Sequence, residues 1–355
     1  MRVVCAGGGT LGPVTPLLAV VEELRRLSPD LQVQWFGTAS GPERQLVESC
    51  GIPFQVLQAG KLRRYWSWQN VFDCVRIAVG VAQAAVWLAR HGADVVLTAG
   101  GYVAVPVGIA AWLWSVPLLV HQQDVRPSLT NKILAPFARR ITVAWPASAA
   151  DFPSQKTVVT GNPVRRQFYN LSQSAARAEA KLDLELPVVV VLGGGTGAAV
   201  LNRITLEALP KLTALAQVVH FTGRGKGGVA SSTNPRYHQI DFAVEAAQLL
   251  AAADIVVTRA GMGSLSELGA LSRAAVVVPI PQSHQEDNAR LLSSHHAALV
   301  LTQASLTADT LVATVSQLLS APDKARVLGR RLGELFPPTA AAAVAREALN
   351  LVHPS

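Results

Sequence analysis

Cysteine is scarce in this chain of 355 residues, and Cys5, Cys50 and Cys74 follow no paired spacing. This excludes a disulfide framework and a cysteine zinc site, and it favours a reducing compartment. The HExxH motif, a Cys/His cluster and an Asp-x-Asp pair are also absent, so we predict no metal and no cofactor. The serine-nucleophile motif G-x-S-x-G is missing too, which argues against a serine hydrolase.

Charged residues make up only 15% of the chain, whereas half of its residues are hydrophobic. This composition excludes disorder and predicts large cores, and the length suffices for two α/β domains. No secretory signal is expected, because the first apolar run stops at Gly7. Residues 102–120 contain no charged residue, and they include Pro106 and Pro117. We therefore predict a buried helix and a strand there, and a soluble or peripheral protein.

The net charge of +8 is unevenly distributed, since residues 61–140 hold nine Lys or Arg against three Asp. The accompanying aromatic residues are Tyr65, Trp66, Trp68, Trp87, Trp112 and Trp114. Tryptophan beside arginine is typical of a membrane interface. A basic region of this kind also suits nucleic acid, or simply solvent beside a tryptophan-containing core. Composition alone leaves these interpretations open.

Two glycine-rich turns each follow a short apolar strand. Residues 7–12 (GGGTLG) follow Val3–Ala6, and residues 193–197 (GGGTG) follow Val188–Leu192. Such turns let backbone N–H groups approach a phosphate at the positive end of a helix. Two of them, a domain apart, predict two Rossmann-like halves facing a cleft. A nicotinamide cofactor is disfavoured, because the next strand ends at Gly37-Thr38 without an acidic residue.

Strand and helix patterns alternate along the chain, which predicts an α/β fold with parallel sheets. Predicted strands cover residues 3–6, 33–36, 94–97, 118–120, 141–144, 188–192, 218–221, 255–257 and 276–279. Predicted helices include residues 16–27, 43–50, 71–89 and 339–351. We expect an N-terminal domain over 1–163, a second domain over 164–336 and a C-terminal helical segment over 337–355.

Polar residues follow three of these strands, where an α/β sheet binds its ligands. Glu267 lies in Arg259–Glu267, after the strand at 255–257. It either completes a capping box with Ser264 as N-cap, or holds a ribose diol beside a phosphate. His284–Ala289 and His121–Asp124 follow two further strands. If a nucleotide diphosphate is cleaved, Arg165 and Arg259 are the arginines expected to neutralise it.

Seven motifs, spread over nearly the whole chain, resemble those of the MurG family of glycosyltransferases in their order. They are Gly8–Val20, Gly100–Trp112, His121–Lys132, Gly161–Arg165, Gly193–Asn202, Arg259–Glu267 and His284–Ala289. The resemblance implies a GT-B fold of two Rossmann-like domains, with a C-terminal helix that crosses back to the first. It also implies inverting, metal-independent transfer of N-acetylglucosamine from UDP-GlcNAc to an undecaprenyl-diphosphate-linked muramoyl-peptide.

The resemblance also implies which residues contact the substrates. The donor nucleotide would lie mainly on the second domain, with Glu267 on the ribose. The donor residues would be Arg165, Gly195, Thr196, Ala243, Met262, Gly263, Ser264, Leu265, Ser266, Glu267, Gln285 and Asn288. From the first domain, Thr10, Leu11, Gly12 and Asp124 would face the donor, and Gly100, Gly101 and Tyr102 would lie on the acceptor side.

Three departures from the family pattern affect the expected chemistry. The family's first loop ends in Gly-Gly-His, whose histidine is a candidate base, but here Pro13 follows Gly12. The family's His-Glu-Gln-Asn is His121-Gln122-Gln123-Asp124 here, so we expect Asp124, with His121, to act as base. The family's Ser-Gln after the second glycine pair is Gly195-Thr196, so the diphosphate contacts are expected to differ.

A lipid-linked acceptor makes the basic, tryptophan-rich region a predicted docking face for an anionic membrane, on the cytoplasmic side, and no nucleic acid is expected. Arg63, Arg64 and Trp66 would contribute to that face. Two alternatives stay open. One is a related GT-B enzyme with another acceptor, or a UDP-sugar epimerase. The other is a UDP-sugar-binding protein that lost catalysis when Pro13 replaced the histidine.

Overall fold

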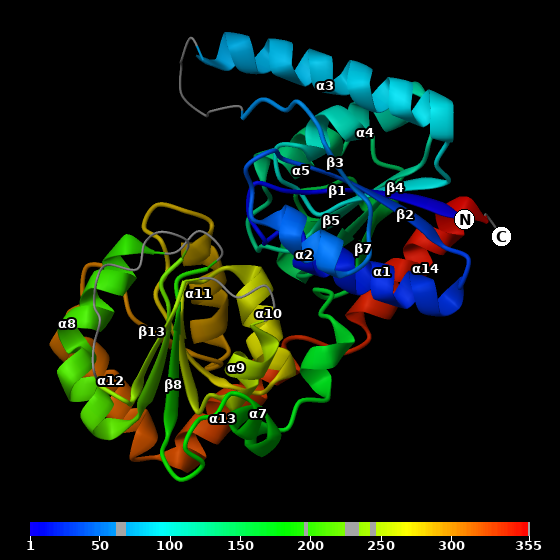
Figure 1. The fold of residues 1–355 in the computed structure, drawn as a ribbon. Helices are drawn as coiled ribbons and strands as arrows, with labels where there is room; N and C mark the ends of the chain where they lie inside the picture. Colours follow the sequence, from blue (N-terminus) through cyan, green and yellow to red (C-terminus); the bar gives the residue numbers. More distant parts are fainter. Residues whose placement is uncertain (62–68, 195–197, 224–233, 242–245, 354–355) are drawn as a thin grey trace. The chain divides into compact units, whose positions relative to one another are not determined.

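The chain folds as two compact units, one of residues Met1–Arg165 with Pro338–Ser355 and the other of Arg166–Pro337. Figure 1 shows both units as they occur in a computed structural model. The structure describes residues 1–61, 69–194, 198–223, 234–241 and 246–353. Each unit contains one fully parallel sheet, as the alternation of strands and helices predicts.

The sheet of the first unit has seven strands in the order β3-β2-β1-β4-β5-β6-β7. The strands are β1 (Arg2–Ala6), β2 (Gln32–Gly37), β3 (Phe54–Val56), β4 (Val95–Thr98), β5 (Leu118–Gln122), β6 (Arg140–Val143) and β7 (Thr157–Val159). The helices are α1 (Thr15–Leu27), α2 (Glu43–Ser49), α3 (Gln69–His91), α4 (Ala104–Leu113), α5 (Leu129–Leu134), α6 (Pro146–Ala149) and α14 (Ala340–Val352). Figure 1 shows α3 and α4 on one face of this sheet and α1 and α14 on the other.

The C-terminal helix α14 is part of this first unit. It packs against α1, and its Glu347 lies 2.8 Å from the Nε of Arg140 in β6. Its buried residues are Ala340, Ala341, Val344, Ala345 and Ala348, which form one apolar face. The chain therefore returns to its N-terminal sheet after the second unit is complete.

The sheet of the second unit has six strands in the order β10-β9-β8-β11-β12-β13. They are β8 (Val188–Leu192), β9 (Gln217–Phe221), β10 (Tyr237–Ile240), β11 (Ile255–Thr258), β12 (Ala274–Val277) and β13 (Leu299–Val300). The helices are α7 (Gln173–Glu179), α8 (Ala199–Leu215), α9 (Ala247–Ala252), α10 (Met262–Ala270), α11 (Gln285–Ser294), α12 (Ala308–Leu319) and α13 (Pro322–Glu334). One core joins the buried valines of β8 and β11 to the apolar faces of α8 and α12.

In both sheets the strand order reverses next to the first strand of the unit. The chain runs outward through β1, β2 and β3 and then crosses to β4, and it repeats this course through β8, β9, β10 and β11. Ligands of open α/β sheets bind beyond the carboxyl ends of the strands at such a switch point. The loops that follow β1, β4, β8 and β11 are therefore the places where a site is expected.

Nine strands are predicted from sequence, and the structure contains a strand at each of those places. The strand predicted over 276–279 begins earlier, at Ala274, and ends at Val277. The uncharged stretch 102–120 forms α4 and the start of β5, as predicted. The four strands that the sequence patterns missed are β3, β7, β10 and β13, and these are the four sheet edges.

Candidate functional site

Two glycine loops of the first unit interlock at its switch point. The loop after β1 contains Gly8 and Gly9, and the loop after β4 contains Gly101 and Tyr102. A Cβ on Gly101 would lie 2.7 Å from the backbone oxygen of Gly8, and one on Gly9 would lie 2.7 Å from the Tyr102 ring. Both glycines have positive φ, +81° and +85°. Only glycine satisfies the backbone angle and the close approach together.

The end of β5 lies against the first of these loops. Gln123 approaches Gly12, since a Cβ on Gly12 would lie 3.6 Å from its Nε2. The backbone oxygen of Asp124 accepts hydrogen bonds from Gln122 Nε2 at 2.8 Å and Ser148 Oγ at 3.2 Å. These bonds fix the backbone of Asp124, whose side chain is partly exposed. The structure therefore gathers the predicted residues Thr10, Leu11 and Gly12, Gly100–Tyr102 and Asp124 at the carboxyl ends of the central strands β1, β4 and β5.

His121 is completely buried, and both of its ring nitrogens have partners. Nδ1 lies 2.9 Å from Thr142 Oγ1, and Nε2 lies 3.0 Å from Asn162 Oδ1. Because an amide oxygen only accepts, Nε2 carries the proton and Nδ1 accepts from the threonine hydroxyl. Burial lowers the pKa of His121 to about 4. The prediction that His121 acts as a base does not fit this geometry, because its ring has no exposed atom to meet a substrate.

Pro13, where the family has its histidine, packs against the second glycine loop. A Cβ on Gly101 would lie 3.3 Å from Pro13 Cγ, and the Pro13 backbone oxygen would lie 3.0 Å from a Cβ on Gly7. Pro13 therefore fills space between the two loops and brings no titratable group to them. Among the predicted residues of this unit, Asp124 is the one whose carboxylate can take a proton.

In the second unit, helix α10 begins at Met262, directly after the loop that follows β11. Its N-cap is Gly261, no side chain caps it, and no described atom comes within 4 Å of a Cβ placed on Gly261. The capping box predicted from Ser264 and Glu267 is wrong, because Ser264 lies inside the first turn. The first turn of α10 therefore presents backbone N–H groups that no side chain caps.

Gln285 and Asn288 form hydrogen bonds with the loop that precedes α10. Gln285 Oε1 accepts hydrogen bonds from the backbone N–H groups of Ala260 and Ile280, both at 3.1 Å. Asn288 Nδ2 donates to the Ala260 carbonyl at 2.9 Å. Both side chains are predicted to complete the donor pocket, and the structure shows that they fix the loop that enters α10.

The predicted donor residues of α10 divide into two groups. Gly263, Ser264 and Glu267 are partly exposed, whereas Met262, Leu265 and Ser266 are buried. The buried group can reach a ligand only through backbone atoms, and Ser266 Oγ already donates to the Gly263 carbonyl at 2.8 Å. The partly exposed group recurs at a spacing of three to four residues, which places it on one face of the helix.

The two arginines expected to neutralise a diphosphate are both buried. Arg259 donates to the carbonyl oxygens of Val278 and Pro279, at 3.2 and 3.4 Å, and to Gln303 Oε1 at 2.9 Å. Its prediction as a diphosphate contact is therefore not supported, because its guanidinium ties β11 to the loop after β12. Arg165 is 5% exposed and ends the first unit.

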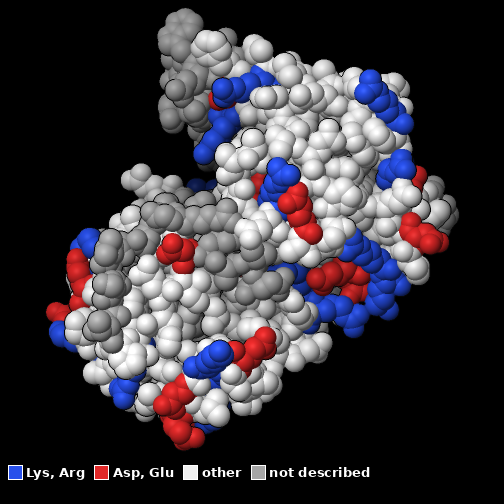
Figure 2. Space-filling model, in the orientation of Figure 1, with Lys and Arg blue, Asp and Glu red and all other residues white. Residues whose placement is uncertain are grey.

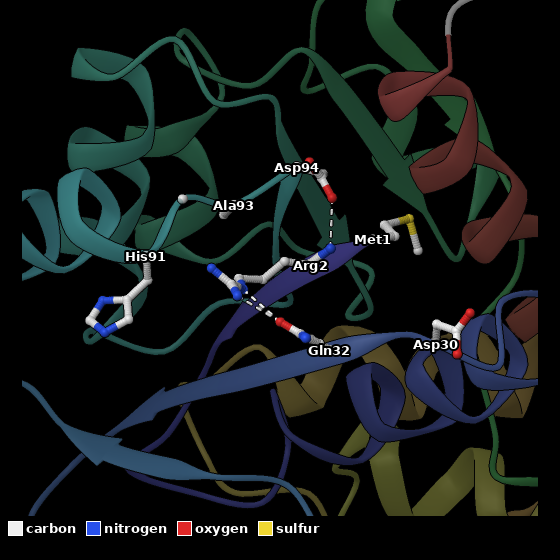
Figure 3. Close-up of a pocket in the computed structure, with 8 residues that line it drawn as sticks. Met1, Arg2, Asp30, Gln32, His91, Ala93 and Asp94 are labelled. Carbon is white, nitrogen blue, oxygen red and sulfur yellow. Dashed lines mark hydrogen bonds between the residues drawn. The ribbon is translucent and has the colours of Figure 1, made fainter.

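Three predicted donor residues, Gly195, Thr196 and Ala243, lie outside the described residues, as do Arg63, Arg64 and Trp66. Within the described ranges, no group of three or more His, Cys, Asp or Glu is arranged to hold a metal ion. A surface hollow lies at the amino ends of β1, β2 and β4, lined in part by Arg2, Gln32 and Asp94 (Figure 3). Its polar groups bond to one another, and it lies at the opposite ends of the strands from the glycine loops.

An apolar stripe covers the outer side of α3. Its residues Phe72, Val75, Val79 and Val86 are exposed, Phe72 by 69%, and Trp112, Leu113 and Trp114 are exposed at the end of the adjoining α4. Residues Phe72–His91 are long and apolar enough to cross a membrane by length and composition, with a mean hydropathy of 1.5, although a core helix passes the same test. Figure 2 shows a mostly uncharged surface over α3 with Lys and Arg at its ends.

Two fully parallel sheets, each with a glycine loop at its switch point, are the Rossmann-like halves that a GT-B-type glycosyltransferase contains. Residues 3–143 match the glycosyltransferase family 28 N-terminal domain, and residues 188–331 match the C-terminal domain of that family. The crystal structure of Acinetobacter baumannii MurG superposes with a TM-score of 0.70 over 98% of this chain and 99% of that one, at 24% identity. The two domain matches establish the class of enzyme, and the superposition shows the fold.

The comparison with curated proteins narrows this class to one family. The UDP-N-acetylglucosamine–N-acetylmuramyl-(pentapeptide) pyrophosphoryl-undecaprenol N-acetylglucosamine transferase of Bacillus pumilus is 34% identical, over 96% of both chains. The Bacillus subtilis enzyme of the same name is 32% identical over 96% of this chain and 97% of its own. The chain belongs to this family of N-acetylglucosamine transferases.

Proposed function

We propose that this protein transfers N-acetylglucosamine from UDP-GlcNAc to the 4-hydroxyl of an undecaprenyl-diphosphate-linked N-acetylmuramoyl-peptide, a step of peptidoglycan synthesis. The observation that carries the proposal is the identity of 34% over nearly the full length to a transferase named for this reaction. The GT-B architecture and the uncapped start of α10 support it, because the reaction needs a site for a nucleotide diphosphate.

The donor is proposed to bind at the start of α10. Its diphosphate would face the backbone N–H groups of the first turn, which stabilise negative charge that grows as UDP leaves. Glu267, one turn further on the same face as Gly263 and Ser264, would accept hydrogen bonds from both ribose hydroxyls. Gln285 and Asn288 would keep this arrangement fixed by holding Ala260.

Asp124 is proposed as the general base. It would take the proton of the muramoyl 4-hydroxyl while that oxygen forms a bond to the anomeric carbon and the bond from this carbon to the UDP oxygen breaks. Attack from the side opposite the leaving group inverts the anomeric centre. His121 would have a positioning role, since it ties β5 to Thr142 and Asn162.

The stripe on α3 and the end of α4 are proposed to rest on the cytoplasmic face of an anionic membrane, where a lipid-linked acceptor is found. An exposed apolar surface with tryptophan and flanking cations suits the headgroup region of a bilayer. Trp87 is not part of this face, because its ring packs edge-on against Phe36 at 5.3 Å. The interpretation of Trp87 as a membrane residue is therefore replaced by a core role.

A second candidate function is UDP-sugar binding without transfer, and Pro13 in place of the family's histidine is the observation that favours it. The two functions are separated by measuring UDP release from UDP-GlcNAc in EDTA, with and without the lipid-linked acceptor. Acceptor-dependent release is expected. Tight UDP-GlcNAc binding without release would overturn the transferase and favour the binding protein.

The role of Asp124 is tested by Asp124→Asn in the same assay. We expect kcat to fall by roughly 100-fold or more, because a positioned base contributes on that order, while UDP-GlcNAc binding stays unchanged. Asp30→Asn is the matched control, since Asp30 is an exposed aspartate at the amino ends of the strands of the same sheet. Full turnover by Asp124→Asn would remove Asp124 from the mechanism.

A further inference from the structure

Glu43, the first residue of α2, has a fully buried carboxyl group. Its Oε1 accepts hydrogen bonds from the backbone N–H of Thr38 at 2.8 Å and from the Thr38 hydroxyl at 2.5 Å. Its Oε2 is buried and has no hydrogen-bond partner among the described residues. A buried polar atom without a partner opposes folding, so its retention calls for a reason.

Three glycines surround this carboxyl group. A Cβ on Gly8 would lie 2.2 Å from Oε1, one on Gly41 would lie 1.8 Å from Oε2, and one on Gly37 would lie 3.3 Å from Oε1. The carboxyl therefore occupies space that any side chain at Gly8 or Gly41 would need. No acidic residue follows β2 directly in the sequence. In the structure, however, Glu43 of α2 places its carboxyl group at the end of β2.

Gly8 is confined on a second side by the other glycine loop. A Cβ on Gly101 would lie 2.7 Å from the Gly8 oxygen and 3.1 Å from the Gly8 nitrogen. Gly8 thus lies between the Glu43 carboxyl and Gly101, and residues Thr10, Leu11 and Gly12 follow at once. Whatever moves Glu43 will move this substrate-facing segment relative to the loop after β4.

We propose that Glu43 is a positioning residue for the transfer reaction, which sets the place of the first glycine loop through backbone contact with Gly8. This role rests on the proposed function, since it assumes that the loop faces the reacting sugars. Glu43 itself touches neither substrate. A displacement of about 1 Å in a substrate-binding segment is enough to lower turnover by roughly 100-fold.

The contact between Glu43 and Gly8 is tested by compensating substitutions. Gly8→Ala places a methyl group against the carboxyl and is expected to lower kcat/KM by roughly 100-fold. Glu43→Ala removes the carboxyl and is expected to lower it by roughly tenfold. In the double variant the methyl group gains the vacated space, so at least a tenfold recovery relative to Gly8→Ala is expected. Glu48→Ala, at the exposed end of the same helix, is the control.

A second measurement separates positioning from general stability. Amide hydrogen exchange of residues 7–14 in the full chain should speed up in Glu43→Ala and return to the wild-type rate in Glu43→Gln, which keeps the acceptor for Thr38. UDP affinity, proposed to reside on α10, should stay unchanged in all variants. A Glu43→Ala variant with a lowered Tm but unchanged loop exchange and unchanged kcat and KM would overturn the proposal.

The two proposals fail in different ways. If wild-type protein transfers no sugar, the proposed function is overturned, and the exchange rates and Tm values of the same variants still decide whether Glu43 holds the loop. If wild-type protein is active and the effects of Gly8→Ala and Glu43→Ala simply add, the positioning role is overturned and the function stands. Non-additive recovery of loop protection supports Glu43 in either case.

Discussion

The two units use the same sequence signature, a glycine-rich turn after a buried strand, for different physical purposes. In the first unit, Gly8, Gly9 and Gly101 are packed against Glu43, Tyr102 and one another. In the second unit, no described atom lies within 4 Å of a Cβ placed on Gly194 or Gly261. In these turns, glycine allows close packing in the first unit, whereas the described atoms of the second unit leave Gly194 and Gly261 open.

This difference matches the roles proposed for the units. An open helix start can admit a nucleotide diphosphate, because the ligand supplies the partners that the backbone N–H groups lack. The interlocked loops suit the role proposed for the first unit, because they would keep the proposed base Asp124 and the predicted acceptor-side residues in a fixed relation. Which role a glycine turn has is decided by what surrounds it, so the turn alone does not identify a site.

The largest expected effect is the loss of stability when a closely packed glycine is replaced by alanine, and an open glycine gives the comparison. Gly101→Ala should destabilise the first unit by roughly 3 kcal/mol, since a positive φ and a contact with the Gly8 backbone both oppose a Cβ. Gly261→Ala should change stability by less than about 1 kcal/mol, because φ is −79° and the space is open. Its methyl group should weaken UDP binding.

Denaturant unfolding measures this contrast for each unit separately. All seven tryptophans of the chain precede residue 166, so tryptophan fluorescence reports the first unit alone, whereas circular dichroism reports both. Equal loss of stability in Gly101→Ala and Gly261→Ala would break the comparison. Unchanged UDP binding in Gly261→Ala would show that α10 does not receive the diphosphate.

Glu267→Ala should weaken UDP binding by roughly 10- to 150-fold, because hydrogen bonds to a charged group contribute about 1.5–3 kcal/mol. Isothermal titration with UDP measures this effect without any acceptor. Glu267→Gln should fall between Ala and the wild type, since an amide offers one acceptor to the two ribose hydroxyls. Glu334→Ala, an exposed glutamate of the same unit, is the control. Equal affinity in Glu267→Ala and the control would return Glu267 to a structural role.

Acid should destabilise both units, because each contains a buried neutral histidine. Burial lowers the pKa values of His121 and His220 to about 4, and unfolding restores them to about 6.5. The stability that each neutral histidine gives its folded unit is therefore fully present above pH 6.5, and it is lost as the pH falls towards 4. At pH 5 each unit should have lost about 2 kcal/mol of stability.

Substitution of these histidines tests the acid effect unit by unit. His121→Gln should flatten the pH dependence of the fluorescence-detected transition, and His220→Gln should flatten that of the second unit, whatever the absolute stability of each variant. His220 lies 3.0 Å from the Tyr237 hydroxyl and 3.2 Å from Asn202 Oδ1, which resembles the setting of His121. His295→Gln, on the surface, should keep the wild-type pH dependence.

The sequence predicts the centres of both sheets and misses their edges, for a physical reason. Central strands of a parallel sheet are buried on both faces and appear as apolar runs such as Val188–Leu192. The edge strands Phe54–Val56, Thr157–Val159, Tyr237–Ile240 and Leu299–Val300 are short and partly exposed, so their residues are mixed in character. Only pairing with a neighbour defines them, and a pattern within one segment contains no information about pairing.

Prediction of the candidate site from the sequence has a similar limit. Glycine turns and polar strand ends are local patterns, so the loops after β1, β4, β5 and β11 are all predicted. What each side chain contacts depends on distant segments. Arg259 bonds to Val278 and Gln303 in place of a diphosphate, and Glu43 reaches the end of β2 from the next helix. Neither contact follows from spacing along the chain.

The smallest expected effect concerns the surface, where the units differ again. In the first unit, seven exposed large apolar residues gather on α3 and at the end of α4, and Leu27, Val56, Leu129 and Val159 lie elsewhere. In the second unit, Leu184, Leu215 and Ile280 come from separate segments. Phe72→Ser with Val75→Ser should weaken binding to vesicles that contain anionic lipid by roughly tenfold, because two side chains lose part of their burial in the bilayer.

A matched substitution shows whether this effect belongs to the stripe. Leu184 is 54% exposed and Leu215 is 37% exposed, so Leu184→Ser with Leu215→Ser also removes two exposed apolar side chains, from the second unit, and should leave vesicle sedimentation unchanged. High salt should weaken binding of the wild type and of Phe72→Ser/Val75→Ser alike, since the cations beside the stripe remain. If the two variants bind vesicles equally well, the exposed face of α3 is not the membrane contact.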